Sequence, residues 1–563
     1  MRSTPLTVLC LGLAVLTAGC VSAPPPEAPT AETAAPTIQK AAETTAVPVT
    51  ETPAAETARP SETIAVTETT EPPFTAVLPV LSLQTEEQGN RALDFVTRPV
   101  APHVAREWAS WNPGARLAPE PYYAPCTVTL TDTDGTSLLP PVSADVKVRG
   151  NWTTFYEKKP LRIKFSEKQN LLGLHGGEPL KNWVLLAEYK DASFLRNKTA
   201  LAIARGILEP DGLYAADAAL TEVKINGEYW GVYLATEQQQ VNPHRIAVTK
   251  PEADSTDTHI GYFLEYDGYY YTEDDLHAFL CDYEDNAPLR PFEGDDDSGR
   301  MIRPLNTGGY DLTKDTGITI KSDIYTQEQH DFIAAYVSNV YRILYRAAYQ
   351  NEAWVFNAEH TEITKADISP EESVRQAIDV QSLADMYLIQ EIACDADIYW
   401  SSFFMDVDFG EGGDGRLRFE APWDFDSAMG NKDRCADGTG FYAANIVPDV
   451  NDQYDTINPW LAVLMHEEWF QKIVRQTWTR AYEAGIFEQA CQEILHDADT
   501  FSEAFARDFA RWDSLRNEDV RNELNSRAAS CRTQKKAAEW LESWLRTRIA
   551  FLDDYWHMPE STE

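Results

Sequence analysis

One long segment of this chain cannot build a hydrophobic core, and it limits where folding can take place. Residues 21–75 consist mainly of Pro, Thr, Ala and Glu and contain almost no aromatic side chains. Such a segment buries too little apolar surface to offset the entropy that a chain loses on ordering. All 15 Trp residues follow residue 100, where apolar residues also become regular. We therefore expect a disordered tether over residues 21–75 and a folded part beyond it.

The first 20 residues have the pattern of a secretory signal. A basic residue, Arg2, precedes an apolar run over residues 6–16 that is too short to span a bilayer. Thr17-Ala18-Gly19-Cys20 then resembles a bacterial lipoprotein signal, in which cleavage leaves Cys20 lipid-modified, although Thr17 stands where Leu is usual. An ordinary secretory signal is the alternative. Because a tether after a lipid anchor would act as a spacer, we favour an extracytoplasmic protein that Cys20 anchors to the bacterial cell membrane.

Charge and cysteine spacing argue against two classes of protein. The formal net charge is −41, whereas a nucleic-acid-binding protein normally presents a basic face. Of the 8 Cys residues, Cys10 and Cys20 belong to the signal, and the others form no C-x-x-C pair of the kind found in zinc knuckles. We expect neither a nucleic-acid partner nor a zinc knuckle.

The first half of the folded part shows the alternation of apolar and polar residues that is typical of strands. Asn226-Gly227 lies between two such runs and is the strongest short-range hairpin signal. The order of strand, strand, helix, strand, strand predicts a small α+β lobe that follows an N-terminal extension over residues 76–125. The expected strands are Cys126–Thr131, Ala144–Arg149, Leu161–Phe165, Glu222–Ile225 and Trp230–Ala235, and the expected helix is Ala192–Arg205.

The second half carries apolar residues at helical spacing. Residues 255–315, between the halves, resemble a loop with acidic runs. No linker-like composition separates the last helices from the rest, so we expect them to complete the same domain. The expected helices are Gln329–Tyr349, Val380–Cys394, Pro459–Tyr482, Thr500–Trp512 and Thr533–Trp556.

Phe403–Met429 is the stretch in which we expect the chemistry. Two alternating runs flank a glycine-rich segment, which supplies the positive-φ residues that a tight reversal needs. This β-hairpin leads to Asp424 and Asp426 at a bend, and Asp397 lies just after the expected helix that ends at Cys394. Carboxylates from neighbouring elements can hold a divalent cation, or one can hold the cation while another acts as a base.

A β-rich region followed by a helical region with an acid-bearing hairpin is the order in which a protein-kinase-like fold is built. We therefore predict an α+β, two-lobed fold, with an N-lobe over about residues 126–250 and a mainly helical C-lobe over about residues 251–563. A phosphoryl-transfer site needs a cation for the phosphates, acids for magnesium and a carboxylate beside the attacking hydroxyl. Arg162 and Lys164 are the candidate cations, and Asp424-Phe425-Asp426 resembles the kinase metal motif D-F-G.

Seven short motifs in order resemble the CotH family, atypical kinases related to the spore coat protein H. The resemblance implies a protein-kinase-like fold, ATP with Mg²⁺ or Mn²⁺ as cofactors, and transfer to Ser or Thr of a protein. The motifs are Arg149-Gly-Asn-Trp, Lys158-Lys-Pro-Leu-Arg-Ile-Lys-Phe165, Asn182-Trp-Val-Leu-Leu-Ala187, Leu195-Arg-Asn197, Asn226-Gly-Glu-Tyr-Trp-Gly-Val-Tyr233, Thr236-Glu-Gln238 and Pro422-Trp-Asp-Phe-Asp426.

Carried over residue by residue, the resemblance implies roles for particular side chains. Asp397 matches the catalytic Asp and Asp424 the metal-binding Asp. Ser402 stands where a kinase has a second metal-binding Asn, and Asp395 stands where the family often has Asn, which leaves the metal preference open. The remaining candidates are Asp426 for the metal, Lys164, Arg162 and Arg149 for phosphate, and Glu237 after the strand that leads to the adenine.

Each of these residues also has a structural interpretation. Asp397 could cap a turn, Asp426 could be a helix N-cap, and Lys164 could simply face solvent. Arg149 could pair with acids instead of phosphate. Asp424 is the residue for which we place function above structure.

Three functions follow from these observations. The first is a surface-anchored kinase that phosphorylates Ser or Thr of a secreted or envelope protein. The second is a noncatalytic adhesion or scaffold protein on a degenerate kinase-like fold. The third is a metal-dependent hydrolase or carbohydrate-active domain that uses the same acids, which the paired carboxylates and abundant Trp allow.

Overall fold

The computed structural model describes residues 74–292, 300–306, 315–432, 436–448 and 455–559. The predicted signal with Cys20 and most of the predicted tether lie outside these residues. Within the described part, no helix is both long and apolar enough to cross a membrane. The predicted mixed α+β class is confirmed, with a β-rich region first and a helical region after it.

Seven strands close into a barrel in the order β1-β2-β3-β4-β5-β7-β6. Apolar side chains that alternate along these strands fill its interior, among them Val146, Ile163, Trp183 and Tyr233. Four of the five predicted strands lie within barrel strands, and the fifth, Ala144–Arg149, extends one residue beyond the end of β3. The strands are β1 (Val80–Thr85), β2 (Ala124–Thr131), β3 (Ser137–Val148), β4 (Leu161–Gln169), β5 (Leu180–Leu186), β6 (Ala218–Ile225) and β7 (Glu228–Glu237).

The barrel is closed by a strand from the predicted N-terminal extension. β1 pairs antiparallel with β2 and parallel with β6, with Leu81 opposite Val223. Asn226 and Gly227 both have positive φ, as the predicted hairpin between β6 and β7 requires. The extension also contains α1 (Asp94–Thr97) and α2 (Pro102–Trp111).

A second, antiparallel sheet has the order β14-β13-β8-β10-β9. The predicted hairpin is confirmed, because Met405 on β13 lies opposite Phe419 on β14. The prediction of a loop over residues 255–315 is wrong at Gly261–Asp267, which forms the central strand β8. Every residue of β8 is buried, so the sequence shows no alternation between its two faces. The strands are β8 (Gly261–Asp267), β9 (Ala278–Phe279), β10 (Gly317–Ile320), β13 (Phe403–Asp408) and β14 (Arg418–Phe419).

The helical part follows the predicted periodicity with two differences. The predicted helix over 459–482 is two helices, α8 and α9, and the sequence analysis missed α6 and α10. The main helices are α5 (Gln327–Tyr345), α6 (Pro370–Ala377), α7 (Val380–Ala393), α8 (Pro459–Ala462), α9 (Glu468–Glu483), α10 (Ile486–Thr500), α11 (Ser502–Trp512) and α14 (Gln534–Trp556). Shorter elements are α4 (Tyr283–Asn286), α12 (Glu518–Asn522), α13 (Ser526–Ser530), β11 (Trp354–Phe356), β12 (Ile363–Lys365), β15 (Val447–Pro448) and β16 (Asp455–Thr456).

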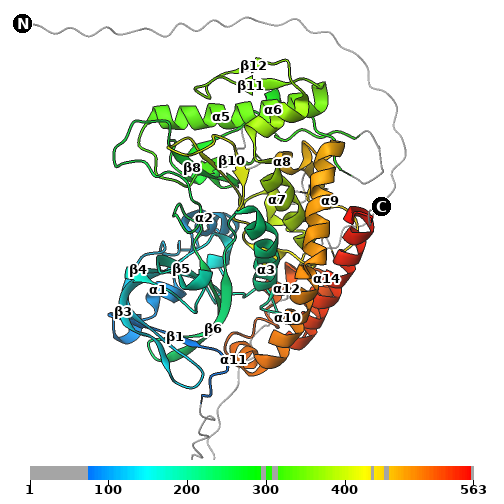
Figure 1. Cartoon of the computed structure of the whole chain (residues 1–563). Coiled ribbons are helices and arrows are strands. Elements are labelled where there is room, and N and C mark those ends of the chain that lie inside the picture. The colour runs from blue at the N-terminus through cyan, green and yellow to red at the C-terminus, as the bar shows by residue number, and fades with distance from the viewer. Residues whose placement is uncertain (1–73, 293–299, 307–314, 433–435, 449–454, 560–563) are drawn as a thin grey trace, which may run out of the picture. The chain divides into compact units, whose positions relative to one another are not determined.

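Helix α3 (Arg196–Leu208) connects β5 to β6 and packs between the barrel and the C-terminal helices (Figure 1). It begins four residues after the predicted start, because the Asp191 carboxylate accepts hydrogen bonds from the backbone N–H groups of Ser193, Leu195 and Arg196. A carboxylate at this position satisfies N–H groups that have no partner within the helix.

Helix α11 joins the helical part to the barrel through a buried ion pair. The Asp508 carboxylate lies 2.6 Å from Lys158 Nζ and accepts a hydrogen bond of 2.7 Å from the Val232 N–H. A Cβ on Gly231 would lie 2.3 Å from this carboxylate, so the glycine makes room for it. Burial raises the pKa of Asp508 and lowers that of Lys158. Desolvation therefore offsets much of the attraction within the pair.

We predict that Asp508→Ala lowers the free energy of unfolding by about 3–5 kcal/mol, because it leaves the Lys158 ammonium buried without a counter-charge. The measurement is urea unfolding of the chain without residues 1–20. Glu503→Ala is the control, since Glu503 lies on the same helix with 72% of its side chain exposed. The double variant Lys158→Met/Asp508→Leu removes both charges, so it should lose less stability than Asp508→Ala. An equal or larger loss in the double variant would contradict the prediction.

Candidate active site

A cavity of about 1080 Å³ lies between the barrel and the second sheet. The barrel side contributes Arg149–Thr153, which precede β4, and Leu186–Lys190, which follow β5. The opposite side contributes Phe263 and Glu265 from β8. The segments that follow α7 and β14, at residues 396–402 and 423–427, supply the acids.

Three carboxylates converge in this cavity. Asp397 begins a 3₁₀ turn (Asp397–Tyr399) four residues after the end of α7, whereas Asp424 and Asp426 follow β14. Asp424 has the left-handed φ of 70°. One oxygen from each of the three side chains lies within 4.8 Å of the other two. Such a group of oxygens suits Mg²⁺ or Mn²⁺, which prefer hard oxygen ligands.

The proximity of these acids disfavours their ionisation. Burial, followed by the charges of Asp426 and Asp397, raises the pKa of Asp424 to about 7. Burial, with Asp397 as the next cause, also raises the pKa of Asp395 well above its ordinary value. A divalent cation would reverse this effect by pairing with the carboxylates. The donor set therefore fits a metal ion.

Basic side chains line the same cavity. Lys190 Nζ lies 3.0 Å from the Asp426 carboxylate and donates a 2.7 Å hydrogen bond to Ser427 Oγ. Burial lowers the pKa of Lys190, but Asp426 and the other acids outweigh burial and raise it, so this lysine is protonated. The Arg149 guanidinium lies 5.6 Å from the Trp423 ring centroid and interacts with Asp424. Lys432 and Lys321 are also in the lining.

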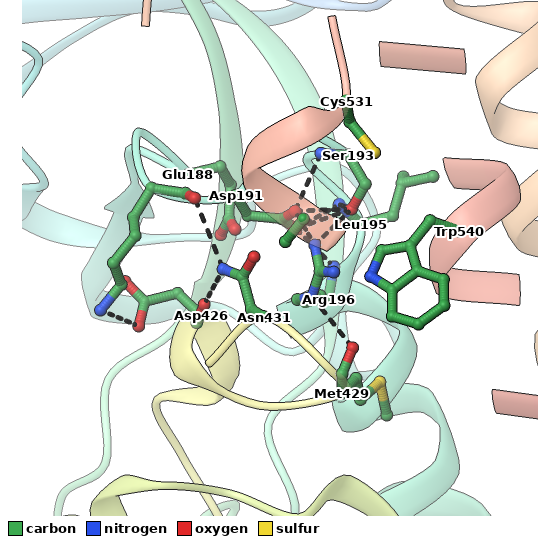
Figure 2. A network of polar contacts seen from close by, with 12 residues as sticks. Glu188, Asp191, Ser193, Leu195, Arg196, Asp426, Met429, Asn431, Cys531 and Trp540 are labelled. Atoms are coloured by element: carbon green, nitrogen blue, oxygen red, sulfur yellow. Dashed lines mark hydrogen bonds and ion pairs between the residues drawn. The ribbon is translucent and has the colours of Figure 1, made fainter. Parts of the chain in front are cut away.

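Hydrogen bonds hold the segment of Lys190 against the segment of Asp424 and Asp426. Figure 2 shows the part of this network around Asn431 and Asp426. Asn197 Nδ2 donates to the Glu188 carboxylate, and its Oδ1 accepts a 2.8 Å bond from the Phe425 N–H. Asn431 Nδ2 donates to the Asp426 carbonyl at 2.7 Å. These bonds fix the backbone on both sides of the acidic cluster.

The comparisons with known proteins agree with this geometry. A family model described as CotH kinase protein matches residues 146–552. The chain belongs to the CotH kinase family. The resemblance predicted from the sequence motifs is therefore confirmed, and membership implies a kinase-like protein that uses ATP and a divalent metal. A search of curated proteins found no significant match.

The structure brings together most of the residues that the CotH motifs single out. Asp397, Asp424, Asp426, Ser402 and Arg149 all line the cavity. The buried Ser402 donates its N–H to the Glu265 carboxylate at 3.1 Å. These positions agree with the roles that the resemblance implies, although geometry alone assigns no role.

Three predicted nucleotide contacts lie outside the lining of the cavity. Arg162 and Lys164 point away from the barrel interior, because Ile163 between them faces it. The Lys164 side chain is exposed, and the Arg162 guanidinium donates a hydrogen bond to Asn182 Oδ1. The Glu237 carboxylate is buried and bonded to Arg245 Nε at 3.2 Å. We therefore include none of the three in the candidate site.

Sequence reasoning missed several charged residues of the site. Lys190 lies between two CotH motifs, and nothing in its neighbours marks it as buried beside acids. Glu265 and Asp267 did carry a signal, because two acids within the apolar run Gly261–Asp267 must be buried. Glu265 pairs with Lys321 at 2.8 Å.

We predict that the stability of the metal-free protein depends on pH through Asp424. In the unfolded chain its pKa is close to the ordinary 3.8, and in the folded protein it is about 7. Between these values only the folded state keeps the proton, so the free energy of unfolding falls as the pH rises, by at most about 1.4 kcal/mol per unit.

Asp424→Asn should make this fall less steep. The measurement is thermal unfolding in a chelator at several values between pH 4.5 and 7.5. Glu411→Gln, an exposed change in the hairpin loop, should keep the slope of the parent. Equal slopes for Asp424→Asn and the parent would show that Asp424 does not titrate in this range.

Proposed function

We propose that this protein is a kinase that transfers the γ-phosphate of ATP to Ser or Thr of a secreted or envelope protein, with Mg²⁺ or Mn²⁺. The observation that carries the proposal is the convergence of Asp397, Asp424 and Asp426 with Lys190 in one cavity. Family membership supports the kinase chemistry. The barrel and the helical part would correspond to the N-lobe and C-lobe of a two-lobed, kinase-like fold.

The acids and cations divide into two groups by what they can do. Asp424 and Asp426 would hold the metal, with the Ser402 hydroxyl available as a further oxygen. A bound divalent ion neutralises phosphate charge in phosphoryl transfer. Lys190 and Arg149 are charged, face the same cavity and can pair with phosphate oxygens.

Asp397 is the group that we assign to the acceptor. Its side chain belongs to the acidic cluster and is less buried than Asp426. Its backbone carbonyl accepts bonds from the N–H groups of Trp400 and Ser401, both at 2.7 Å, which fix the turn that carries it. A carboxylate held in this way can orient the attacking hydroxyl and accept its proton.

We predict that ATP with Mg²⁺ or Mn²⁺ raises the melting temperature of the chain without residues 1–20, because a ligand that binds only the folded state stabilises it. Asp424→Ala should lose both this shift and phosphate transfer. Asp397→Asn should keep the shift in melting temperature and slow phosphate transfer by at least about 100-fold, because it removes only the carboxylate that accepts the proton of the attacking hydroxyl.

Glu411→Gln is the control for both measurements and should behave as the parent. Transfer by Asp424→Ala at the parental rate would refute the site. A folded parent with no shift in either metal would favour the noncatalytic scaffold.

We also propose that Cys20 anchors the protein to the extracytoplasmic side of the membrane, which rests on the signal-like residues 1–20. Cys20→Ser should move the protein from the membrane fraction to the soluble fraction and remove incorporation of a labelled fatty acid. Cys10→Ser, within the apolar run, is the matched control and should leave both unchanged. A parent found only in the soluble fraction would rule out the anchor.

A further inference from the structure

Helix α2 forms part of the cavity wall, although it precedes the residues that match the CotH family model. Figure 1 shows α2 between the barrel strands and the second sheet. The buried Val104 and Ala105 pack in one cluster with Trp152. The Ala101 N–H donates a 2.9 Å hydrogen bond to Thr154 Oγ1. The helix is therefore fixed to the segment after β3 that also lines the cavity.

A second side of α2 presents three side chains to the cavity. His103, Glu107 and Trp111 recur every four residues, which places them on one side of a helix. Trp111 is 60% exposed, an unusual position for so large an apolar side chain. Within the described residues, His103 Nε2 is buried and has no hydrogen-bond partner. An exposed indole and an unsatisfied ring nitrogen beside an exposed carboxylate are features of a binding surface.

Ring contacts connect this face to Asp397. The His103 ring lies 4.7 Å from the Tyr269 ring, and Tyr269 meets Trp400 edge-on at 5.7 Å. Trp400 belongs to the turn of Asp397, to whose carbonyl its N–H donates. Burial raises the pKa of Tyr269, and the charges of Asp397 and Glu107 raise it further, so Tyr269 is close to both carboxylates.

We propose that the His103–Glu107–Trp111 face of α2 binds the protein segment that carries the acceptor hydroxyl, and that it determines which acceptors are used. The inference rests on the proposed function, because it takes Asp397 as the group that receives the hydroxyl. A peptide lying along α2 would cover Trp111 with a side chain that flanks the acceptor. Its backbone N–H groups could donate to Glu107. Exposed Trp side chains commonly dominate the energetics of such contacts.

A nucleotide base is the other occupant that an aromatic wall could suit. A different part of the cavity fits the base better, because its lining includes Leu186 from β5 and the stacked rings of Phe263 and Phe404 from the second sheet. Gln238 and Gln239, which follow β7, also belong to the lining. Planar apolar surface with amide groups beside it is what a base needs. The α2 face remains for the acceptor.

The test compares Trp111→Ala and Glu107→Gln with the parent on an arrayed library of Ser- and Thr-containing peptides. We expect the Michaelis constant for the preferred peptides to rise at least tenfold and the preference for flanking residues to weaken. The Michaelis constant for ATP, the turnover number and the ATP-induced shift in melting temperature should change less than twofold. Trp111→Phe should restore most of the peptide preference.

Ser110→Ala is the matched control, since Ser110 is exposed on the same helix and is not part of the cavity lining. Unchanged peptide constants in both variants would overturn the inference. So would a selective loss of ATP binding, which would assign the face to the nucleotide. A parent that is stabilised by ATP but phosphorylates no peptide also overturns it. The absence of any ATP effect would instead refute the proposed function.

Discussion

The side-chain amide of Asn197 holds together the two segments on which the site depends. It donates to the buried Glu188 carboxylate and accepts from the Phe425 N–H. One residue at the start of α3 thereby connects the end of β5, which leads to Lys190, with the turn of Asp424 and Asp426. Burial raises the pKa of Glu188 well above its ordinary value, which shifts this group towards its neutral form. A neutral link can be buried without the desolvation penalty of an ion.

The acidic cluster itself works against stability. Three carboxylates that lie close together beside Asp395 repel one another, and this repulsion adds to burial in raising the pKa of Asp424. The ion pair between Lys190 and Asp426 offsets part of this repulsion. The packing of α3 between the barrel and the helices holds the segments that carry these acids in place. Electrostatic repulsion of this kind is usual at functional sites, because activity requires charged groups to lie close together at a cost in stability.

The parts of this structure that could be predicted are those whose signals are local. Strands β2, β3 and β4 could be predicted because one face is buried and the other is not, and β6 and β7 because Asn226-Gly227 marks the hairpin between them, whereas β1 and β5 were missed. The late helices could be predicted because their apolar residues recur at helical spacing. β8 gave no such signal, since it is buried on both faces. Alternation also explains why Arg162 and Lys164 lie outside the lining of the cavity, since Ile163 between them faces the barrel interior. Lys190 was invisible because its significance comes from Asp426, more than 200 residues away.

Helix α2 and the three acids differ in whether they lie inside the region that matches the CotH family. Asp397, Asp424 and Asp426 lie inside the residues that match CotH, whereas β1 and α2 precede them. β1 is needed for the barrel to close, so residues outside the match are part of the same fold. A chain that must supply this strand can carry α2 as part of the cavity wall without disturbing the acids. Chemistry and selectivity can then reside on separate segments, and a change in α2 alters what reaches Asp397 while the reacting groups stay in place.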